Sequence, residues 1–428
     1  MTGANLRLVV LLAGVLLPAA LAAQQPATVS LGEAIELALR VQPAVVEARG
    51  AVTNARAGSR EVTGSWLPQL NANTSWSRSQ VSATYNQEGI PFTPPANNYR
   101  AGWSASINIF DGFQRLAEGR AASADFESAD AGLTNQQFQV TLQVKQAFFN
   151  ALAADELLRV SNTRIERAAQ QLKVAKEKLA AGSATRSDTL RSAVELGNAQ
   201  LQLLNAQTSQ ASTRAALARL IGYDGPVQAV GDSALFILDP LDTAALREEL
   251  LRTAPAVISA EANAKAAAAS VAVAKAQYFP IVRGTFAQNW TGTEVGALED
   301  RWTAGVSLNW TLFNGFTREA GVTRSSVSRE SAQAQADDAR RQASAQLTQQ
   351  LATLESSRAQ IDISRQSLAA AQEDLRVVQE RYRLGAATIV DVLTSQVTLD
   401  DAEIAYIRAR LDFLVARAEL AALLGREL

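Results

Sequence analysis

Two long stretches of the chain are free of proline and carry apolar residues at helical spacing. No proline occurs between Pro95 and Pro226, and none follows Pro280. In the first stretch, leucine or isoleucine recurs every seven residues from position 158 to 179. Proline breaks helices, and a seven-residue apolar spacing packs helices by knobs into holes. The pattern predicts two very long helices, over 113–181 and 316–384, each followed by a further long helix, over 187–220 and 389–424.

Shorter segments alternate between apolar and small polar residues. The alternation runs from Leu70 to Ser77 and from Trp103 to Ile109, and it returns most regularly from Val306 to Leu312. A period of two is typical of strands with one apolar and one polar face. We therefore expect β-hairpins over 67–110 and 279–313. Their apolar face would form the core of a soluble sandwich, or would meet lipid in an outer-membrane barrel.

The chain reads as two copies of one unit. Trp66-Leu67-Pro68 recurs as Tyr278-Phe279-Pro280, which is 212 positions later when counted from Trp66 to Tyr278. Phe110-Asp111-Gly112-Phe113 recurs as Phe313-Asn314-Gly315-Phe316, which is 203 positions later when counted from Phe110 to Phe313. Constant displacements on either side of one loop of altered length indicate a tandem duplication. The predicted units, each a short helix, a hairpin and two long helices, are residues 24–222 and 242–428, joined by a connection over 223–241.

The first 23 residues have the composition of a secretory signal peptide. Arg7 precedes an apolar run over 8–17, and Ala20-Leu21-Ala22-Ala23 supplies a cleavage site of small residues. The run is too short for the alternative, a transmembrane anchor, which needs about 20 residues. No later segment is an unbroken apolar run of that length. If the rest of the chain enters a membrane, it must enter as strands.

The absence of two residue types narrows the possible chemistry. The 428 residues include no cysteine and no histidine. This excludes disulfides, thiolate or imidazole metal sites, cysteine nucleophiles and Ser-His-Asp triads. The remaining carboxylates show no clustered, pocket-like pattern, so we expect no catalytic residue, no metal and no cofactor. The formal net charge of -2 gives no broad basic surface, and we expect no nucleic-acid partner.

Tryptophan is confined to the predicted strands and their ends. The predicted long helices hold none, and tryptophan gathers where a membrane meets water. Packing inside a sandwich is the alternative. Four strands are too few to close a barrel, for which about eight are needed, so several chains would have to share one barrel in a membrane. The expected membrane-interface aromatics are Trp66, Trp76, Trp103, Trp290, Trp302 and Trp310.

The breaks between the long helices complete a recognisable set of motifs. Gly182 is followed by Asp188, and Gly385 is followed at the same spacing by Asp391. Together with the paired Phe-Asp/Asn-Gly-Phe junctions, these motifs make residues 28–428 resemble the TolC-like outer-membrane efflux proteins. The resemblance implies a mainly α fold with a small β part. It implies a homotrimer whose twelve-stranded transmembrane β-barrel, with four strands per chain, continues into a long periplasmic α-helical barrel.

The resemblance also implies a location, a function and partners. It places the chain in the Gram-negative outer membrane, with the connection over 223–241 in the equatorial region of the tube. Such proteins are exit ducts of tripartite efflux pumps or type I secretion systems, and they passively conduct small molecules or secreted proteins without enzymatic activity. The implied partners are a periplasmic adaptor (membrane fusion) protein, an inner-membrane transporter of the RND, ABC or MFS type, and outer-membrane lipid. A periplasmic coiled-coil scaffold or adaptor without a pore remains the alternative.

The resemblance assigns a periplasmic gate to the helical tips. Asp391 matches an aspartate that rings the constriction of the tube, while Tyr382 and Asp188 match positions that tie neighbouring tip helices together. Ala387 and Thr394 stand where the family has an arginine link and a second aspartate ring, so this gate should be held differently. From the residues alone, helix capping remains open for Asp391 and Asp188, and core packing remains open for Tyr382.

Two further groups of residues belong to the expected site. The adaptor proteins of the family dock at the helical tips, which correspond here to Gly182, Ser183, Gly385, Ala386 and Thr388. The junctions between strands and long helices are formed by Phe110, Gly112, Phe113, Phe313, Gly315 and Phe316.

Overall fold

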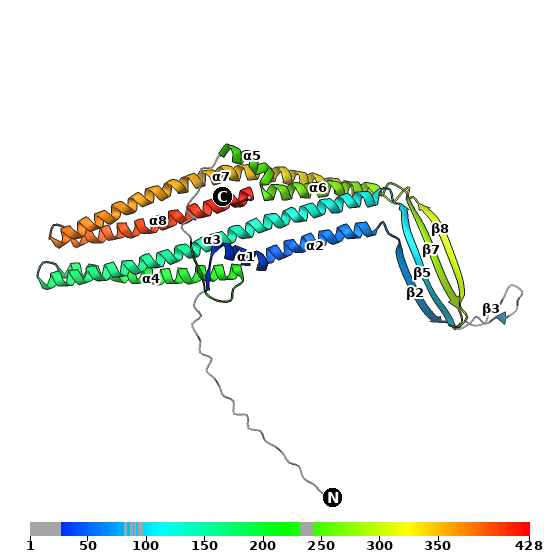
Figure 1. Ribbon diagram of the computed structural model, residues 1–428, viewed down its shortest axis with the longest axis horizontal. Coiled ribbons are helices and arrows are strands. Elements are labelled where there is room, and N and C mark those ends of the chain that lie inside the picture. Colours follow the sequence, from blue (N-terminus) through cyan, green and yellow to red (C-terminus); the bar gives the residue numbers. More distant parts are fainter. Residues whose placement is uncertain (1–26, 81–83, 86–88, 90, 93–96, 232–242) are drawn as a thin grey trace, which may run out of the picture.

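The molecule is long and narrow, with helices side by side and a curved sheet at one end (Figure 1). The structure is a computed structural model. The expected signal peptide, residues 1–23, lies outside the part of the chain that the structure describes, as do residues 232–241 of the expected connection. The described residues are 27–80, 84–85, 89, 91–92, 97–231 and 243–428.

The two halves of the chain contain matching elements. The first half holds β1 (Ala27–Val29), α1 (Leu31–Val41), α2 (Pro43–Gly64), β2 (Gln69–Arg78), β3 (Thr84–Tyr85), β4 (Pro91–Phe92), β5 (Asn97–Phe110), α3 (Gln114–Ala180) and α4 (Arg186–Ile221). The second half holds β6 (Val227–Ala229), α5 (Thr243–Thr253), α6 (Pro255–Ala276), β7 (Ile281–Gly292), β8 (Glu299–Asn309), α7 (Thr317–Arg383) and α8 (Ile389–Leu424). The bounds of α5 and α6 are those of α1 and α2 plus 212, and the bounds of α7 and α8 are those of α3 and α4 plus 203.

The long helices α3 and α7 have 67 residues each, which corresponds to rods of roughly 100 Å. Each rod ends at a glycine in the left-handed conformation, with φ 72° at Gly182 and 80° at Gly385. The amide of Ser183 donates to the carbonyl oxygen of Lys178 at 2.9 Å, so the last turn of α3 is closed by backbone hydrogen bonds. The chain then reverses into α4 or α8, which gives two long helical hairpins.

The prediction of a single short helix at the start of each unit is wrong, because each unit has two helices in that place. Pro43 and Pro255 stand at the first position of α2 and α6. Proline lacks an amide hydrogen and clashes with the preceding turn, so it ends one helix and can begin the next. The chain therefore bends between α1 and α2, and again between α5 and α6.

The four main strands form one antiparallel sheet in the order β2-β5-β7-β8. The two expected hairpins are both present, as β2 with β5 and β7 with β8, and β5 pairs with β7 to join them. A register shift in β5 between Asn108 and Phe110 interrupts the pairing beside the junction with α3. Two-stranded pairs also form between β1 and β6 and between β3 and β4.

The helices form a wall in which each long helix packs mainly on its direct neighbours. The order is α2-α3-α6-α7 next to the sheet and α4-α3-α8-α7 in the remote half (Figure 1). The main core lies midway, where α1 and α5 pack on the long helices, and its fully buried side chains include Phe148, Leu217, Val257 and Leu420. Among the described helices, none combines the length and the hydropathy that a membrane-spanning helix requires.

Candidate functional site

The strand register separates apolar and polar residues onto opposite faces of the sheet. Residues directly opposed in an antiparallel sheet share a face, and successive residues alternate. One row joins Leu70, Ala105 and Phe286, and the next row on that face holds Trp103 and Trp302, both opposite Gln288. The rows on the opposite face carry mainly small polar residues, including Asn71, Ser104, Thr285 and Thr303.

The apolar face of the sheet is exposed within one chain. The exposed fraction is 62% for Trp76, 65% for Trp302 and 66% for Leu308. Trp66, Trp103 and Trp310 are also exposed, and Trp290 is half-buried. A sandwich would bury these side chains under a second sheet, and no such sheet is present among the described residues.

The two outer strands of the sheet are open edges. β2 pairs only with β5, and β8 pairs only with β7. Every residue of β2 and β8 is exposed. Long edges with unpaired backbone groups are templates for pairing with a further strand. Within the described chain, the sheet is therefore an unclosed fragment.

The expected junction residues form two tight turns between strand and helix. Gly112 and Phe113 have φ 68°, and Gly315 and Phe316 have φ 65° and 64°. A phenylalanine in the left-handed region is strained, and here its ring packs edge-on against the first phenylalanine of its motif. The centroid distance is 5.3 Å in the first junction and 5.4 Å in the second.

An arginine that the sequence reasoning missed links each junction to the aromatic residue before the hairpin. Arg115 forms a buried ion pair with Asp111 at 2.5 Å, and its guanidinium lies 4.2 Å from the ring centroid of Trp66. Arg318 lies 4.8 Å from the ring of Tyr278 and donates to backbone carbonyl oxygens near the end of β8. The sequence does contain a signal for these residues, because Arg115 recurs as Arg318, 203 positions later.

The two junctions differ in their surroundings. A Cβ atom added at Gly112 would lie 2.5 Å from Cβ of Phe279 and 2.8 Å from the carbonyl oxygen of Ala276. A Cβ atom added at Gly315 would meet nothing within 4 Å. Phe313 and Phe316 are 72% and 69% exposed. The second junction therefore lacks, within one chain, the neighbour that the first junction has.

The expected gate aspartates are the third residues of capping boxes. Asp391 accepts a hydrogen bond from the amide of Thr388 at 2.8 Å, and its own amide donates to the Thr388 hydroxyl at 3.3 Å. Asp188 and Thr185 make the same pair of bonds at the start of α4. The bonds from Thr388, first from its amide and then from its hydroxyl, lower the pKa of the exposed Asp391 carboxyl group below its ordinary value. The capping alternative thus holds for both residues, and it leaves the Asp391 carboxylate charged.

Tyr382 lies at the contact between the two tips. Its side chain is buried in a small apolar cluster of α7 and α8, and its hydroxyl has no hydrogen-bond partner among the described residues. Burial, followed by the charge of Asp188, raises the pKa of this phenol. Lys178 of α3, whose role the sequence did not indicate, donates to the carbonyl oxygen of Tyr382 at 2.5 Å and lies 4.4 Å from its ring centroid. Lys178 therefore ties the tip of the α3–α4 hairpin to the tip of the α7–α8 hairpin.

A cluster of charged residues, which we call the α3–α8 ion cluster, joins the hairpins farther from the tips. Asp400 of α8 forms an ion pair with Arg164 at 3.0 Å and accepts a hydrogen bond from Arg167 at 2.7 Å. Arg164 also pairs with Glu195 of α4 at 2.8 Å, and Arg167 pairs with Glu403 at 2.9 Å. Asp400 is 3% exposed, and its burial raises the pKa of the carboxyl group, against the opposing effect of the two arginines.

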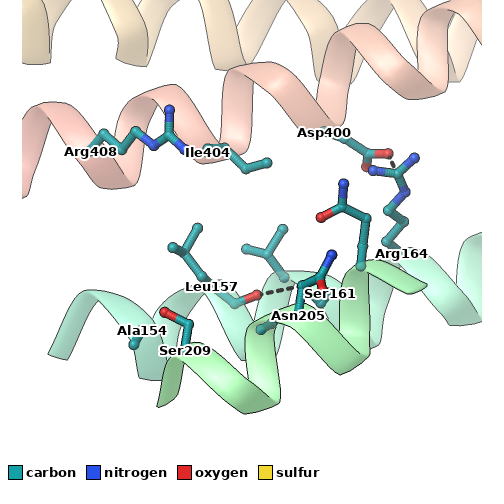
Figure 2. A pocket seen from close by; sticks show the side chains of 12 residues that line it. Ala154, Leu157, Ser161, Arg164, Asn205, Ser209, Asp400, Ile404 and Arg408 are labelled. Atoms are coloured by element: carbon teal, nitrogen blue, oxygen red, sulfur yellow. Dashed lines mark hydrogen bonds and ion pairs between the residues drawn. The ribbon is translucent and has the colours of Figure 1, made fainter. Parts of the chain in front are cut away.

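A cavity of about 190 Å³ lies beside this cluster, between α3, α4 and α8. Figure 2 shows Asp400 and Arg164 at one end, with Leu157 and Ile404 along the cavity and Asn205 on the α4 side. Its lining mixes apolar and polar side chains. Among the described residues, no group of three or more acidic side chains is placed to hold a metal ion.

Comparisons with known proteins give a family and a fold. The family model described as "Outer membrane efflux protein" matches residues 34–223 and 246–426. The crystal structure of the outer membrane protein VceC from Vibrio cholerae superposes with a TM-score of 0.80, covering 93% of this chain and 96% of that one, at 20% identity. The helical wall with a terminal sheet is therefore a fold shared with an outer membrane protein.

Curated relatives match over shorter stretches. Protein CyaE of Bordetella pertussis is 27% identical over 321 residues, which cover 73% of this chain and 66% of the relative. The pyoverdine export outer membrane protein OpmQ of Pseudomonas aeruginosa is 31% identical over 225 residues, which cover 50% of this chain and 46% of the relative. Each alignment spans less than two thirds of the length of the relative.

Proposed function

Because the chain belongs to the outer membrane efflux protein family, whose fold is that of channel and transport proteins, we propose that it is an outer-membrane exit duct. The duct passively conducts solutes from the periplasmic side to the outside and carries out no enzymatic reaction. Two unpartnered edges on an amphipathic sheet are the observation that carries this proposal.

Three copies of the chain close the sheet into a barrel of twelve strands, in which β8 of each copy pairs with β2 of the next. The tryptophan face then meets lipid, and the face of asparagine, serine and threonine lines water. The strand β2 has 10 residues, which is roughly 33 Å along a strand. With a strand tilt of 35–45°, this length matches an apolar band about 25 Å tall.

The unequal junctions support assembly in a ring. The first junction packs on Phe279, which begins the second hairpin of the same chain. The equivalent neighbour of the second junction, by the 212-residue displacement, is Leu67 of the next copy. Ring closure would cover Phe313 and Phe316, which are exposed in one chain. The two repeats, residues 24–222 and 242–428, would thus have equivalent surroundings around the ring, with the connection over 223–241 at the equator.

The helical tips form the periplasmic end of this duct. Asp391 and Asp188 are fixed at the first turns of α8 and α4 by their capping boxes, and Tyr382 and Lys178 join the two hairpins. We assign Asp391, Tyr382 and Asp188 to the gate. The glycine turns at Gly182 and Gly385 present the reversals at which a periplasmic adaptor would dock, with an inner-membrane transporter beyond it.

The relatives support a proposal only for the class of the exported solute. The similarity to OpmQ, a pyoverdine export outer membrane protein, favours a small molecule as the exported solute. Secreted proteins are the other class that an exit duct of this kind would pass.

Planar bilayer recording on the purified protein tests the proposal. A stable trimer that extracts with outer membranes and gives steady ion conductance is expected. A soluble periplasmic protein without conductance would contradict the duct and would favour a coiled-coil scaffold.

A further inference from the structure

The charged residues of the sheet are divided unequally between its two faces. In the described strands, the face opposite the tryptophans carries three arginines and one glutamate. Arg100, Thr291 and Glu299 form one row, and Arg301 lies opposite Asn289 two residues farther along β8. Arg283 lies nearer the helices, where it donates to the side-chain oxygen of Asn108 at 3.1 Å.

Two of these arginines are at the end of the sheet remote from the helices and are free of ion pairs. Arg100 is near the start of β5, and Arg301 is near the start of β8. Both side chains are exposed, and no ion pair is formed by either among the described residues. Glu299, on the same face, is a single opposing charge per chain. The rest of this face consists mainly of Asn, Ser, Thr and Gly.

The sign of the charge on this face of the sheet determines which ions it favours. Arginine stays protonated at every physiological pH, so the charge is permanent. Rings of arginine or lysine favour anions in pores, whereas rings of aspartate or glutamate favour cations. A charge acts over about 10 Å in 0.1 M salt and about 3 Å in 1 M salt. Repetition of Arg100 and Arg301 around a shared barrel would therefore create a positive zone along its water-filled wall.

We infer that the outer mouth of the duct favours anionic solutes through Arg100 and Arg301. This inference rests on the proposed function, because it requires the polar face of the sheet to line the bore. At the helical tips, the exposed Asp391 contributes a negative charge instead. The exported solute is therefore an anion, or a molecule with an anionic group that leads it past this zone.

Reversal potentials in a potassium chloride gradient test the inference. In the double variant Arg100→Gln/Arg301→Gln, the chloride-to-potassium permeability ratio is expected to fall by roughly twofold or more near 0.1 M salt, and the difference is expected to vanish at 1 M. Citrate, a trivalent anion added on the sheet side, should reduce the current through the unchanged protein more than through the double variant.

The matched control is Arg78→Gln. Arg78 pairs with Asn97 at the same end of the sheet, but alternation places it on the face of Trp76. This variant should keep the permeability ratio of the unchanged protein, and Arg301→Lys should do the same because the charge remains. Equal ratios and equal citrate effects in the double variant and the unchanged protein would overturn the inference while leaving the duct intact. Absence of conductance in every form would instead contradict the proposed function.

Discussion

Asp391 shows how one side chain serves a local structural role and leaves a charge available. Its carboxylate completes the capping box of α8 with Thr388, and these hydrogen bonds lower its pKa from the ordinary value of 3.8. Because the folded pKa is depressed, the cap is fully present above the ordinary value and is lost as pH falls through the lowered one. At neutral pH the tip therefore carries a fixed negative charge.

If Asp391 lines the proposed constriction, the substitution Asp391→Asn should raise the chloride-to-potassium permeability ratio in planar bilayers, because it removes this negative charge. Thr388→Ala is the matched control, since it breaks the capping box at a cost of about 1 kcal/mol but keeps the carboxylate. Selectivity should be unchanged in the control. If Asp391→Asn leaves selectivity unchanged as well, Asp391 does not line the constriction.

The two junction glycines give a second prediction from single residues. Gly112→Ala should destabilise the folded chain by about 1–3 kcal/mol, because the added Cβ atom meets Phe279 and φ is 68°. In a monomer, Gly315→Ala would cost only about 1 kcal/mol, since no neighbour lies within 4 Å of its Cβ position. In the ring, Leu67 of the next copy occupies the equivalent place. Heat stability of the trimer on gels should therefore fall as much for Gly315→Ala as for Gly112→Ala, and an intact, equally stable trimer with Gly315→Ala would contradict that packing.

Among the elements, the contact between α3 and α8 differs along its length. Midway along the molecule it belongs to the apolar core, which includes Phe148 and Leu414. Toward the tips it is held by the α3–α8 ion cluster. Beyond that cluster, Lys178 of α3 contacts Tyr382 of α7. The two hairpins are therefore joined by apolar packing midway and by charged side chains toward the tips.

Asp400→Asn should weaken this joint, because the half-buried Arg164 and Arg167 lose a charged partner that they share. The expected loss is about 2–4 kcal/mol, seen as a lower midpoint of helical unfolding by circular dichroism. Asp401→Asn is the control, because Asp401 is exposed on the same turn and should change stability by less than about 0.5 kcal/mol. Equal midpoints for both variants would show that the ion cluster does not hold the hairpins together.

The elements were largely predictable because their patterns are local. Proline-free stretches with seven-residue spacing gave the long helices, and alternation gave the strands, which the structure confirms. The division of each short helix was readable from Pro43 and Pro255 but was not predicted. The α3–α8 ion cluster was not predictable, since Arg167 and Asp400 are 233 residues apart and only packing brings them together. The capping boxes could have been found from the repeated Thr-x-x-Asp spacing at 185–188 and 388–391.

At the level of the whole molecule, one chain presents surfaces that only further copies would satisfy. Among the described residues, the sheet has two open edges, most of its tryptophans are exposed, and nothing lies within 4 Å of a Cβ atom placed at Gly315. The edges of the helical wall are α2 and α4 on one side and α7 on the other. A ring of three chains in a membrane would pair the open edges, cover the second junction and place the tryptophans against lipid, whereas a monomer in water would do none of these.

The register of the joint between copies follows from the repeat. Ser104 of β5 lies opposite Ala287 of β7 within one chain. The equivalent of Ser104 in β8 is Ser307, 203 positions later, and the equivalent of Ala287 in β2 is Ser75, 212 positions earlier. Ser307 of one copy should therefore lie opposite Ser75 of the next, on the polar face.

Disulfide cross-linking of Ser75→Cys with Ser307→Cys tests the shared barrel most directly, because the chain has no cysteine of its own to interfere. Oxidised outer membranes should yield covalent dimers and trimers on denaturing gels, which reductant returns to monomers. Thr74→Cys with Ser307→Cys is the control, since Thr74 points to the opposite face and should link far less. A Ser75→Cys/Ser307→Cys protein that stays monomeric after oxidation, like the control, would contradict the closure of one barrel by three chains.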